Sequence, residues 1–164
     1  MKTINYERAV NLKHITLDDL YNNFSAISNT LSDDIKIIVE KEAPLTLNTL
    51  KARMREIFDV AKISGKALEF ILDELNKGKY IMEDEIYDTI IWPSSGKFNI
   101  NYLRINSDRL IYDIPSAEFK NLVKEYDLEG EELYRAILKY FNLEVLTQKA
   151  RDFLTYIEKV SRGR

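Results

Sequence analysis

The sequence contains one stretch twice, and this repeat constrains the fold more than any other feature. The segment Leu45–Leu75 returns from Leu128 onward at a constant shift of 83 positions, without a gap. Self-similarity at a fixed shift indicates a repeated structural unit. Two unrelated amphipathic helix pairs would reproduce part of the pattern, because most matches are apolar residues at helical spacing. The identical pairs are Leu45/Leu128, Leu50/Leu133, Phe58/Phe141, Lys66/Lys149, Ala67/Ala150 and Phe70/Phe153.

The length and composition of the chain limit what the repeat can belong to. With 164 residues, the chain fits one domain or two small lobes. The absence of cysteine excludes disulfides, thiolate metal sites and cysteine nucleophiles. The first ten residues contain no apolar signal-peptide core, and no stretch reaches the length of a membrane span. We therefore expect a cytoplasmic protein with no membrane partner.

The region before the repeat has two helix start signals. Residues 1–15 show no period and are expected to be a linker or a loosely docked arm. Thr16 is a candidate N-cap, and the apolar residues from Leu17 to Ile27 follow helical spacing. Ser32 is a second candidate start, and Pro44 is expected to end the helix that follows it.

The first copy of the repeat predicts two helices followed by a β-hairpin. The apolar face of the first helix runs from Leu47 to Phe58, and Ser64 is expected to cap the second helix, which ends near Gly78. Two short strands, Tyr80–Met82 and Tyr87–Trp92, are expected to turn at a group of acidic residues. Three helices followed by a hairpin is the element order of a winged helix, and of some other small α+β domains.

The second copy predicts a similar unit without a wing. Residues 99–114 are β-prone and are expected to form either a second hairpin or an extended crossover. Pro115 and Ser116 begin a helix with Phe119 on its apolar face, and Thr147 is expected to cap the last helix. The buried stripe of that last helix is expected to be Ala150, Phe153, Leu154, Ile157 and Val160.

These elements predict an α+β, mainly α fold with two tandem units resembling a winged helix or helix-turn-helix, each with three helices. Only the first unit is expected to carry a β-hairpin wing. The expected organisation is an arm with an amphipathic helix (1–30), a winged-helix-like lobe (31–96), an extended or hairpin connector (97–115) and a three-helix lobe (116–164).

Four short sequence features carry a resemblance to a known family. They are the Glu42–Leu45 step, Trp92-Pro93, Ile114-Pro115 and the leucine-rich final helices, within roughly Asp33 to Val160. On these features the chain resembles a winged-helix-like domain of unknown function. That domain occurs at the C-terminal end of large bacterial superfamily-one helicase and nuclease-like proteins. The resemblance implies an accessory role beside DNA-processing machinery, with helicase or nuclease domains as partners and no catalytic residues.

Catalytic and metal chemistry find little support in the residues. His14 is the only histidine and lies in the least patterned segment, where a solvated side chain is the simplest interpretation. The chain has no Gly-rich phosphate loop. The acidic group Glu83, Asp84, Glu85 and Asp88 lacks the spacing and glycine of a calcium loop, so a solvated hairpin tip is favoured. We expect a non-enzymatic protein with no cofactor and no bound metal.

Basic residues on the repeated helices provide a candidate nucleic-acid surface. DNA-binding helix pairs neutralise phosphates with nearby Lys and Arg. The net charge of −3 argues against a general nucleic-acid coat, so we expect weak, non-specific contact with DNA. Solvated charges on ordinary helices are the competing interpretation. The candidate residues are Lys51, Arg55, Lys62 and Lys66 in the first lobe and Arg135, Lys139, Lys149 and Arg151 in the second.

A docking or oligomerisation module without nucleic-acid contact is the alternative function. The mixed surface charge and the ten tyrosines suit protein recognition. On the hairpin, Tyr80, Tyr87 and Trp92 are candidate anchors for a partner. Their other possible role is to cover the core of their own lobe.

Overall fold

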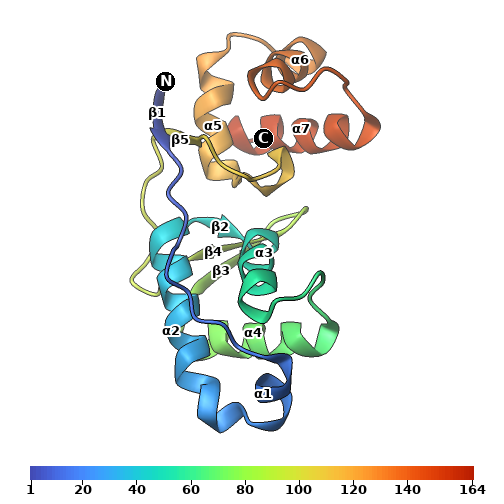
Figure 1. Cartoon of the computed structure of the whole chain (residues 1–164). Helices are drawn as coiled ribbons and strands as arrows, with labels where there is room; N and C mark the ends of the chain where they lie inside the picture. The colour runs from blue at the N-terminus through green and yellow to red at the C-terminus, as the bar shows by residue number, and fades with distance from the viewer. The chain divides into compact units, whose positions relative to one another are not determined.

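The computed structural model describes all residues, 1–164, and divides the chain into two compact units (Figure 1). The N-terminal unit is residues 7–97, and the C-terminal unit combines residues 98–164 with residues 1–6. Each unit encloses an apolar core of its own. The prediction of a mainly helical α+β fold is confirmed.

In the N-terminal unit, helices surround a small antiparallel sheet. The strand order is β2-β4-β3, with Leu45 opposite Ile91 and Ile81 opposite Trp92. The chain visits one helix pair, a short strand, a second helix pair and a hairpin in turn. The elements are α1 (Leu17–Asn22), α2 (Phe24–Glu42), β2 (Leu45–Thr46), α3 (Leu47–Phe58), α4 (Gly65–Lys77), β3 (Ile81–Asp84) and β4 (Thr89–Trp92).

Local capping chemistry explains where most of these helices begin. The hydroxyl oxygens of Thr16 and Ser64 accept hydrogen bonds from the third backbone N–H that follows, as predicted for both caps. The predicted start at Ser32 is wrong. No proline or glycine interrupts residues 24–42, so α2 is continuous, and Ser32 lies exposed in its middle. The helix ends at Glu42, just before Pro44, as predicted.

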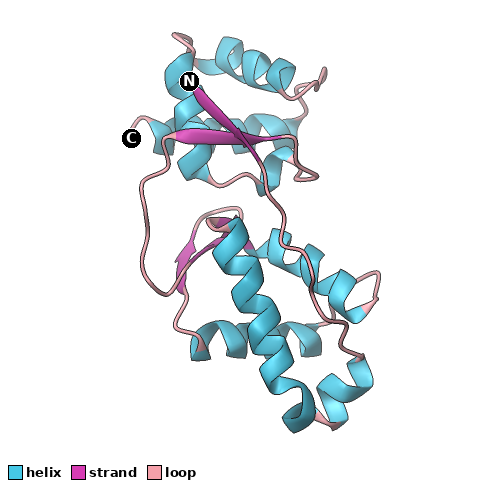
Figure 2. Cartoon of the chain, turned by 60° about the vertical axis from the view of Figure 1, so that its left-hand side comes forward, coloured by secondary structure: helices cyan, strands magenta, loops and turns pink.

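The C-terminal unit joins three helices to a two-stranded parallel sheet. Lys2 pairs with Tyr102 and Asn5 with Ile105, so the sheet joins the first residues of the chain to a strand that is far away in sequence (Figure 2). A 3₁₀ turn, η1, and three helices follow the second strand. The elements are β1 (Lys2–Asn5), β5 (Tyr102–Ile105), η1 (Ile111–Asp113), α5 (Ser116–Glu125), α6 (Gly130–Tyr140) and α7 (Gln148–Ser161).

The structure groups two segments differently from the sequence prediction. Residues 99–114 form neither a second hairpin nor a free crossover, because Tyr102–Ile105 pairs with the N-terminal strand. That strand, Lys2–Asn5, lies in what was expected to be a linker or a loosely docked arm. The hairpin strands are Ile81–Asp84 and Thr89–Trp92, shifted by one or two residues from their predicted bounds.

The repeated sequence folds into the same helix pair in both units. A shift of 83 carries the start of α3 to the start of α6, and the start of α4 to the start of α7. Thr147 caps α7 as Ser64 caps α4. After the first helix of each pair the backbone turns through the left-handed region, at Asp59 (φ 52°) and Asn142 (φ 57°). The repeat therefore extends to backbone conformation.

The same hydrogen bonds close both helix ends. The N–H of Val60 donates to the carbonyl of Arg55, and the N–H of Leu143 donates to the carbonyl of Leu138. This is the six-residue bond of a Schellman motif.

Most predicted core positions of α7 are buried, but Val160 is exposed at the end of the helix, contrary to the predicted buried stripe. None of the helices combines the length and apolarity needed to cross a membrane.

Candidate nucleic-acid interface

Two of the three cations of α3, Lys51 and Arg55, lie away from the buried side of the helix, whereas Arg53 is buried. The hydroxyl of Thr46 caps the helix by accepting from the N–H of Thr49 at 3.0 Å. Leu50 and Met54 then face the core. Lys51 and Arg55 are four residues apart, so they point to the same side of the helix, and both are half-buried. Their stems cover apolar surface while their charged heads stay near water.

The connection between α3 and α4, together with the first helical turn of α4, continues this basic surface. Lys62 is exposed in the turn after the left-handed Asp59. Lys66 follows on α4, and its Nζ lies 4.3 Å from the centroid of the Tyr21 ring. Lys51, Arg55 and Lys62 make no ion pair with a carboxylate. We call these four residues the α3–α4 basic strip.

The rest of the N-terminal unit limits where an anion could approach. On α4, Glu69 and Asp73 are exposed on the face beyond Lys66. The hairpin is acidic as well. Carboxylates near a phosphate backbone are repulsive, so favourable contact is confined to α3 and the turn that follows it.

The acidic residues of the hairpin are used in local hydrogen bonds. The indole N–H of Trp92 donates to Glu83 Oε1 at 2.6 Å, and the ammonium of Lys97 pairs with the same carboxylate. The Thr89 hydroxyl donates to Asp84 Oδ1 at 2.9 Å. Asp88 accepts from the backbone N–H of residue 48 at 3.1 Å. No group of three or more His, Cys, Asp and Glu side chains is placed to hold a metal ion.

The structure separates the three candidate anchors on the hairpin. Tyr80 packs against the core of its own unit, and Trp92 is buried, so Trp92 does not present an exposed ring to a partner. Tyr87 is 43% exposed at the tip of the hairpin, next to Ile86, which is 80% exposed. Only the tip therefore presents apolar surface outward.

In the C-terminal unit, most of the predicted cations already have partners. The guanidinium of Arg135 pairs with Glu131 at 2.7 Å, and that of Arg151 pairs with the same carboxylate at 3.1 Å. The hydrogen bond from Arg135 and the neighbouring Arg151 lower the pKa of Glu131, so the carboxylate stays ionised between them. Lys149 Nζ lies 4.1 Å from the centroid of the Tyr112 ring. Lys139 is exposed and makes no ion pair.

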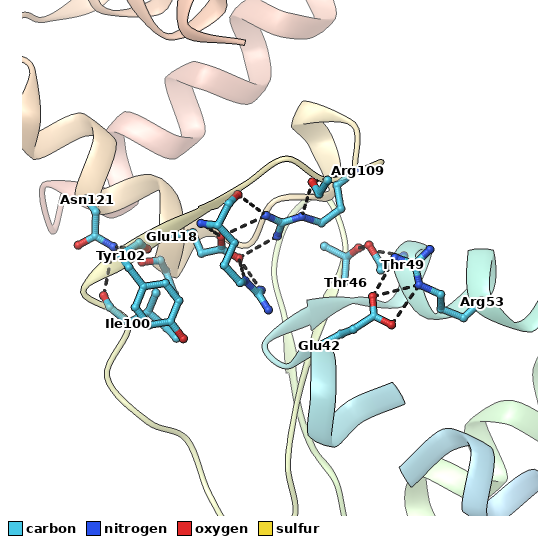
Figure 3. Close-up of polar contacts among 12 residues, drawn as sticks. Glu42, Thr46, Thr49, Arg53, Ile100, Tyr102, Arg109, Glu118 and Asn121 are labelled. Carbon is cyan, nitrogen blue, oxygen red and sulfur yellow. Dashed lines mark hydrogen bonds and ion pairs between the residues drawn. The ribbon is translucent and has the colours of Figure 1, made fainter. Parts of the chain in front are cut away.

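Two buried ionic clusters, one in each unit, were missed by the sequence analysis. In the N-terminal unit, the Arg53 guanidinium donates to Glu42 from Nε at 3.0 Å and from Nη2 at 2.8 Å, with both side chains buried (Figure 3). The backbone N–H of Ala9 donates to the other oxygen of Glu42 at 3.2 Å. This cluster ties the segment before α1 to α2 and α3. One sequence signal existed, because Arg53 interrupts the apolar face of α3.

The second cluster centres on Glu118 in the C-terminal unit. Arg104 Nη2 lies 2.5 Å and Arg109 Nη1 2.8 Å from Glu118 Oε1 (Figure 3). Both guanidinium groups also lie over the ring of Tyr6. Burial raises the pKa of Glu118, but the two guanidinium groups outweigh it, and the pKa lies below its ordinary value of 4.5. The cluster joins β5 to α5 and to the residue that follows β1. Tyr6 is far in sequence from the other three residues, so no local pattern predicts the complete cluster.

The remaining titratable candidate, His14, has a structural partner. Its Nδ1 lies 2.6 Å from the carbonyl oxygen of Ile57, and the backbone N–H of Ile15 donates to that same oxygen at 3.0 Å. The ring therefore helps to hold the segment before α1 against the end of α3. The carboxylate of Glu56 lines the same cavity as His14, but its ion pair is with Arg8.

Comparison of the chain with protein-family models, with curated proteins and with solved structures found no match. Function is therefore inferred from the geometry of the chain's own residues.

Proposed function

We propose that the chain is a non-enzymatic accessory module of a nucleic-acid-processing, helicase-associated system, and that it binds DNA weakly and without sequence preference. The contact surface consists of three residues of the α3–α4 basic strip, Lys51, Arg55 and Lys62, because Lys66 lies over the ring of Tyr21. One observation carries the proposal: Lys51 and Arg55 lie one helical turn apart on α3, Lys62 is exposed in the turn that follows, and none of the three is neutralised by a carboxylate.

The architecture of the N-terminal unit supports this proposal. Its element order, α2-β2-α3-α4-β3-β4, and its strand order, β2-β4-β3, are consistent with a winged helix. In a helix-turn-helix the second helix of the pair enters the major groove. Here α4 exposes Glu69 and Asp73, which suits neither phosphate contact nor an Arg- or Asn-based reading of bases. The contact therefore involves the DNA backbone only.

The strength of this contact follows from counterion release. Three cations on three phosphates give a slope of about −2.7 for log affinity against log salt concentration. Affinity then falls by about 40-fold between 50 mM and 200 mM salt. Binding is thus measurable at low salt and nearly lost at moderate salt.

A titration of labelled duplex and single-stranded DNA at 20 mM and 150 mM salt tests the proposal. We expect low-salt binding by the native chain and at least tenfold weaker binding by the triple variant K51Q/R55Q/K62Q. The matched control K36Q/K124Q/K159Q changes the net charge equally at exposed positions elsewhere. Absence of low-salt binding, or an equal loss in the control, would overturn the proposal.

Protein docking remains the second candidate function, and a specific observation in the C-terminal unit favours it. Where the N-terminal unit has Arg55 and Lys62, a shift of 83 places Leu138 and Val145. These two positions of the repeated helix pair are thus basic in one unit and apolar in the other. Leu138 is buried, but Val145 is 70% exposed and presents apolar surface to a partner.

A further inference from the structure

The edge of strand β5 that faces away from β1 is covered by side chains. The side-chain amide of Asn121 donates to the carbonyl of Tyr102 at 3.0 Å (Figure 3). The next outward groups belong to Arg104: its N–H donates to Glu118 Oε2 at 3.0 Å, and its carbonyl accepts from Arg109 Nη2 at 2.9 Å. These bonds use the groups to which a further strand would pair, so β5 is closed on this side.

Strand β1 has no such cover. All its residues are exposed, and β5 is its only neighbour in the sheet (Figure 2). The N–H of Tyr6 donates to the carbonyl of Ile105 at 2.8 Å, so the backbone groups of Tyr6 and, by alternation, Ile4 face β5. The backbone groups of Thr3 and Asn5 therefore face away from β5, and they make no hydrogen bond within the chain.

This open edge is only weakly protected against pairing. Proteins block exposed edges with charged residues, proline or bulges. Strand β1 contains one charge, Lys2, and no proline. In the sheet of the N-terminal unit, the edge strand β3 carries the carboxylates of Glu83 and Asp84, which repel a like strand, and the other edge strand, β2, is buried. Strand β1 is therefore the edge that can accept another strand.

We propose that β1 pairs antiparallel with β1 of a second copy of the chain, about a two-fold axis at Ile4. In this register Thr3 lies opposite Asn5 of the second copy, and the outward backbone groups of the two residues point at each other. Each N–H and C=O that β1 leaves open is then used. The contact is independent of the proposed DNA contact, which uses the N-terminal unit.

Charge selects this register over the alternatives. The two Lys2 side chains lie at opposite ends of the contact, about 14 Å apart along the strands. Parallel pairing would place Lys2 directly beside Lys2 of the second copy, and an axis at Thr3 would bring the two within about 7 Å. At the axis, Ile4 meets Ile4 of the second copy, a favourable pair of β-branched side chains. Strand β1 thus complements itself in backbone pattern, charge and side-chain type, which favours a second copy over an unrelated strand.

Disulfide trapping tests the register, and it is specific because the chain contains no cysteine. At the axis the two Cα atoms of residue 4 are about 4.5 Å apart, a separation that a disulfide can span. We expect oxidised I4C to form a covalent dimer that a reducing agent reverses. K2C, on the same face of β1, is the matched control and should give at least tenfold less dimer. Equal yields from I4C and K2C would indicate random collision and overturn the proposal, and a dimer from T3C but not from I4C would contradict the register.

Sedimentation equilibrium of the full chain tests association without a cross-link. The contact is small, so we expect weak self-association, visible only toward millimolar concentration. T3P removes an N–H that β5 does not use, and should weaken association at least tenfold. T3V keeps this N–H and should associate like the native chain. A native chain that stays monomeric at millimolar concentration, or equal association of the native chain and T3P, overturns the proposal.

Two controls separate this contact from unfolding and from the DNA surface. T3P should unfold at the same denaturant concentration as the native chain, because the fold does not use the N–H of Thr3. If T3P is instead destabilised, the comparison of I4C with K2C decides the proposal. The variant K51Q/R55Q/K62Q should self-associate like the native chain. Loss of association in that variant would place the contact on the N-terminal unit and contradict the proposal.

Discussion

Lys66 and Lys149 lie 83 positions apart, and each rests its ammonium over a tyrosine ring, at 4.3 Å and 4.1 Å from the ring centroids. The two rings, Tyr21 and Tyr112, do not follow the repeat in sequence. Each ring also packs against the equivalent phenylalanine of its unit, Phe70 or Phe153. The recurring lysine is therefore explained by packing within each unit, without an external anion.

The lysine–tyrosine contact should be measurable as a small stability term. K66M keeps an apolar stem but removes the cation over Tyr21, so the free energy of unfolding should fall by about 0.5–1 kcal/mol. K149M should have the same effect in the other unit. Denaturant unfolding measures both, with K62M as a control that should change stability by less than about 0.5 kcal/mol. Equal destabilisation by K62M would contradict a specific ring contact.

The buried pair Glu42–Arg53 should be costly to break from one side. R53M leaves the carboxylate of Glu42 buried without its cation, and E42Q leaves Arg53 without its anion. We expect each variant to lower the free energy of unfolding by about 3–5 kcal/mol. The double variant E42Q/R53M should lose less than the sum of the two, because no charge is then stranded. Strict additivity in denaturant unfolding would argue against direct coupling.

Acid should weaken the C-terminal unit through Glu118. Because the folded-state pKa of Glu118 lies below its ordinary value of 4.5, its contribution to stability is present above that value. The contribution is lost as the pH falls through the lower folded-state pKa. The stability difference between the native chain and E118Q should thus be largest near neutral pH and shrink in acid.

Unfolding curves recorded between pH 7 and pH 3 check this expectation. E132Q serves as the control, since Glu132 is an exposed residue of the same unit. Its stability difference from the native chain should remain small across the range. A native-to-E118Q difference that grows on acidification would mean that the sign of the pKa shift is wrong.

The parts of the fold that could be predicted from sequence are those fixed by local chemistry. Thr16, Ser64 and Thr147 were predicted as caps because a hydroxyl three residues before a free backbone N–H is a local signal. The same signal misled at Ser32, where no proline or glycine interrupts the chain and α2 continues through the residue. A possible cap therefore marks a helix start only where the chain also breaks.

The parts that could not be predicted depend on distant partners. Lys2–Asn5 becomes a strand only because Tyr102–Ile105 pairs with it, and no turn joins the two. The cluster around Glu118 likewise needs Tyr6 beside it. These contacts join segments with no common local pattern, so the expected linker is a structural strand.

Only part of the candidate site could be predicted from sequence. The eight basic residues could be identified, and the i,i+4 spacing of Glu131 and Arg135 is a local signal for one ion pair. The pairing of Arg151 with the same carboxylate depends on a residue 20 positions away. Four of the eight candidates, Lys51, Arg55, Lys62 and Lys139, make neither an ion pair nor a ring contact in the structure. The first three belong to the α3–α4 basic strip, and Lys139 lies in the last turn of α6.

Mapping where DNA contacts the molecule would test the proposed function at the level of single residues. Amide ¹H–¹⁵N spectra of the full chain can be recorded at low salt while unlabelled duplex is added. We expect the largest shift changes to fall on α3, its turn and the start of α4, residues 47–66, and K51Q/R55Q/K62Q to abolish them. Largest changes on the acidic hairpin, residues 81–92, or on α6 and α7 would contradict the proposed DNA contact.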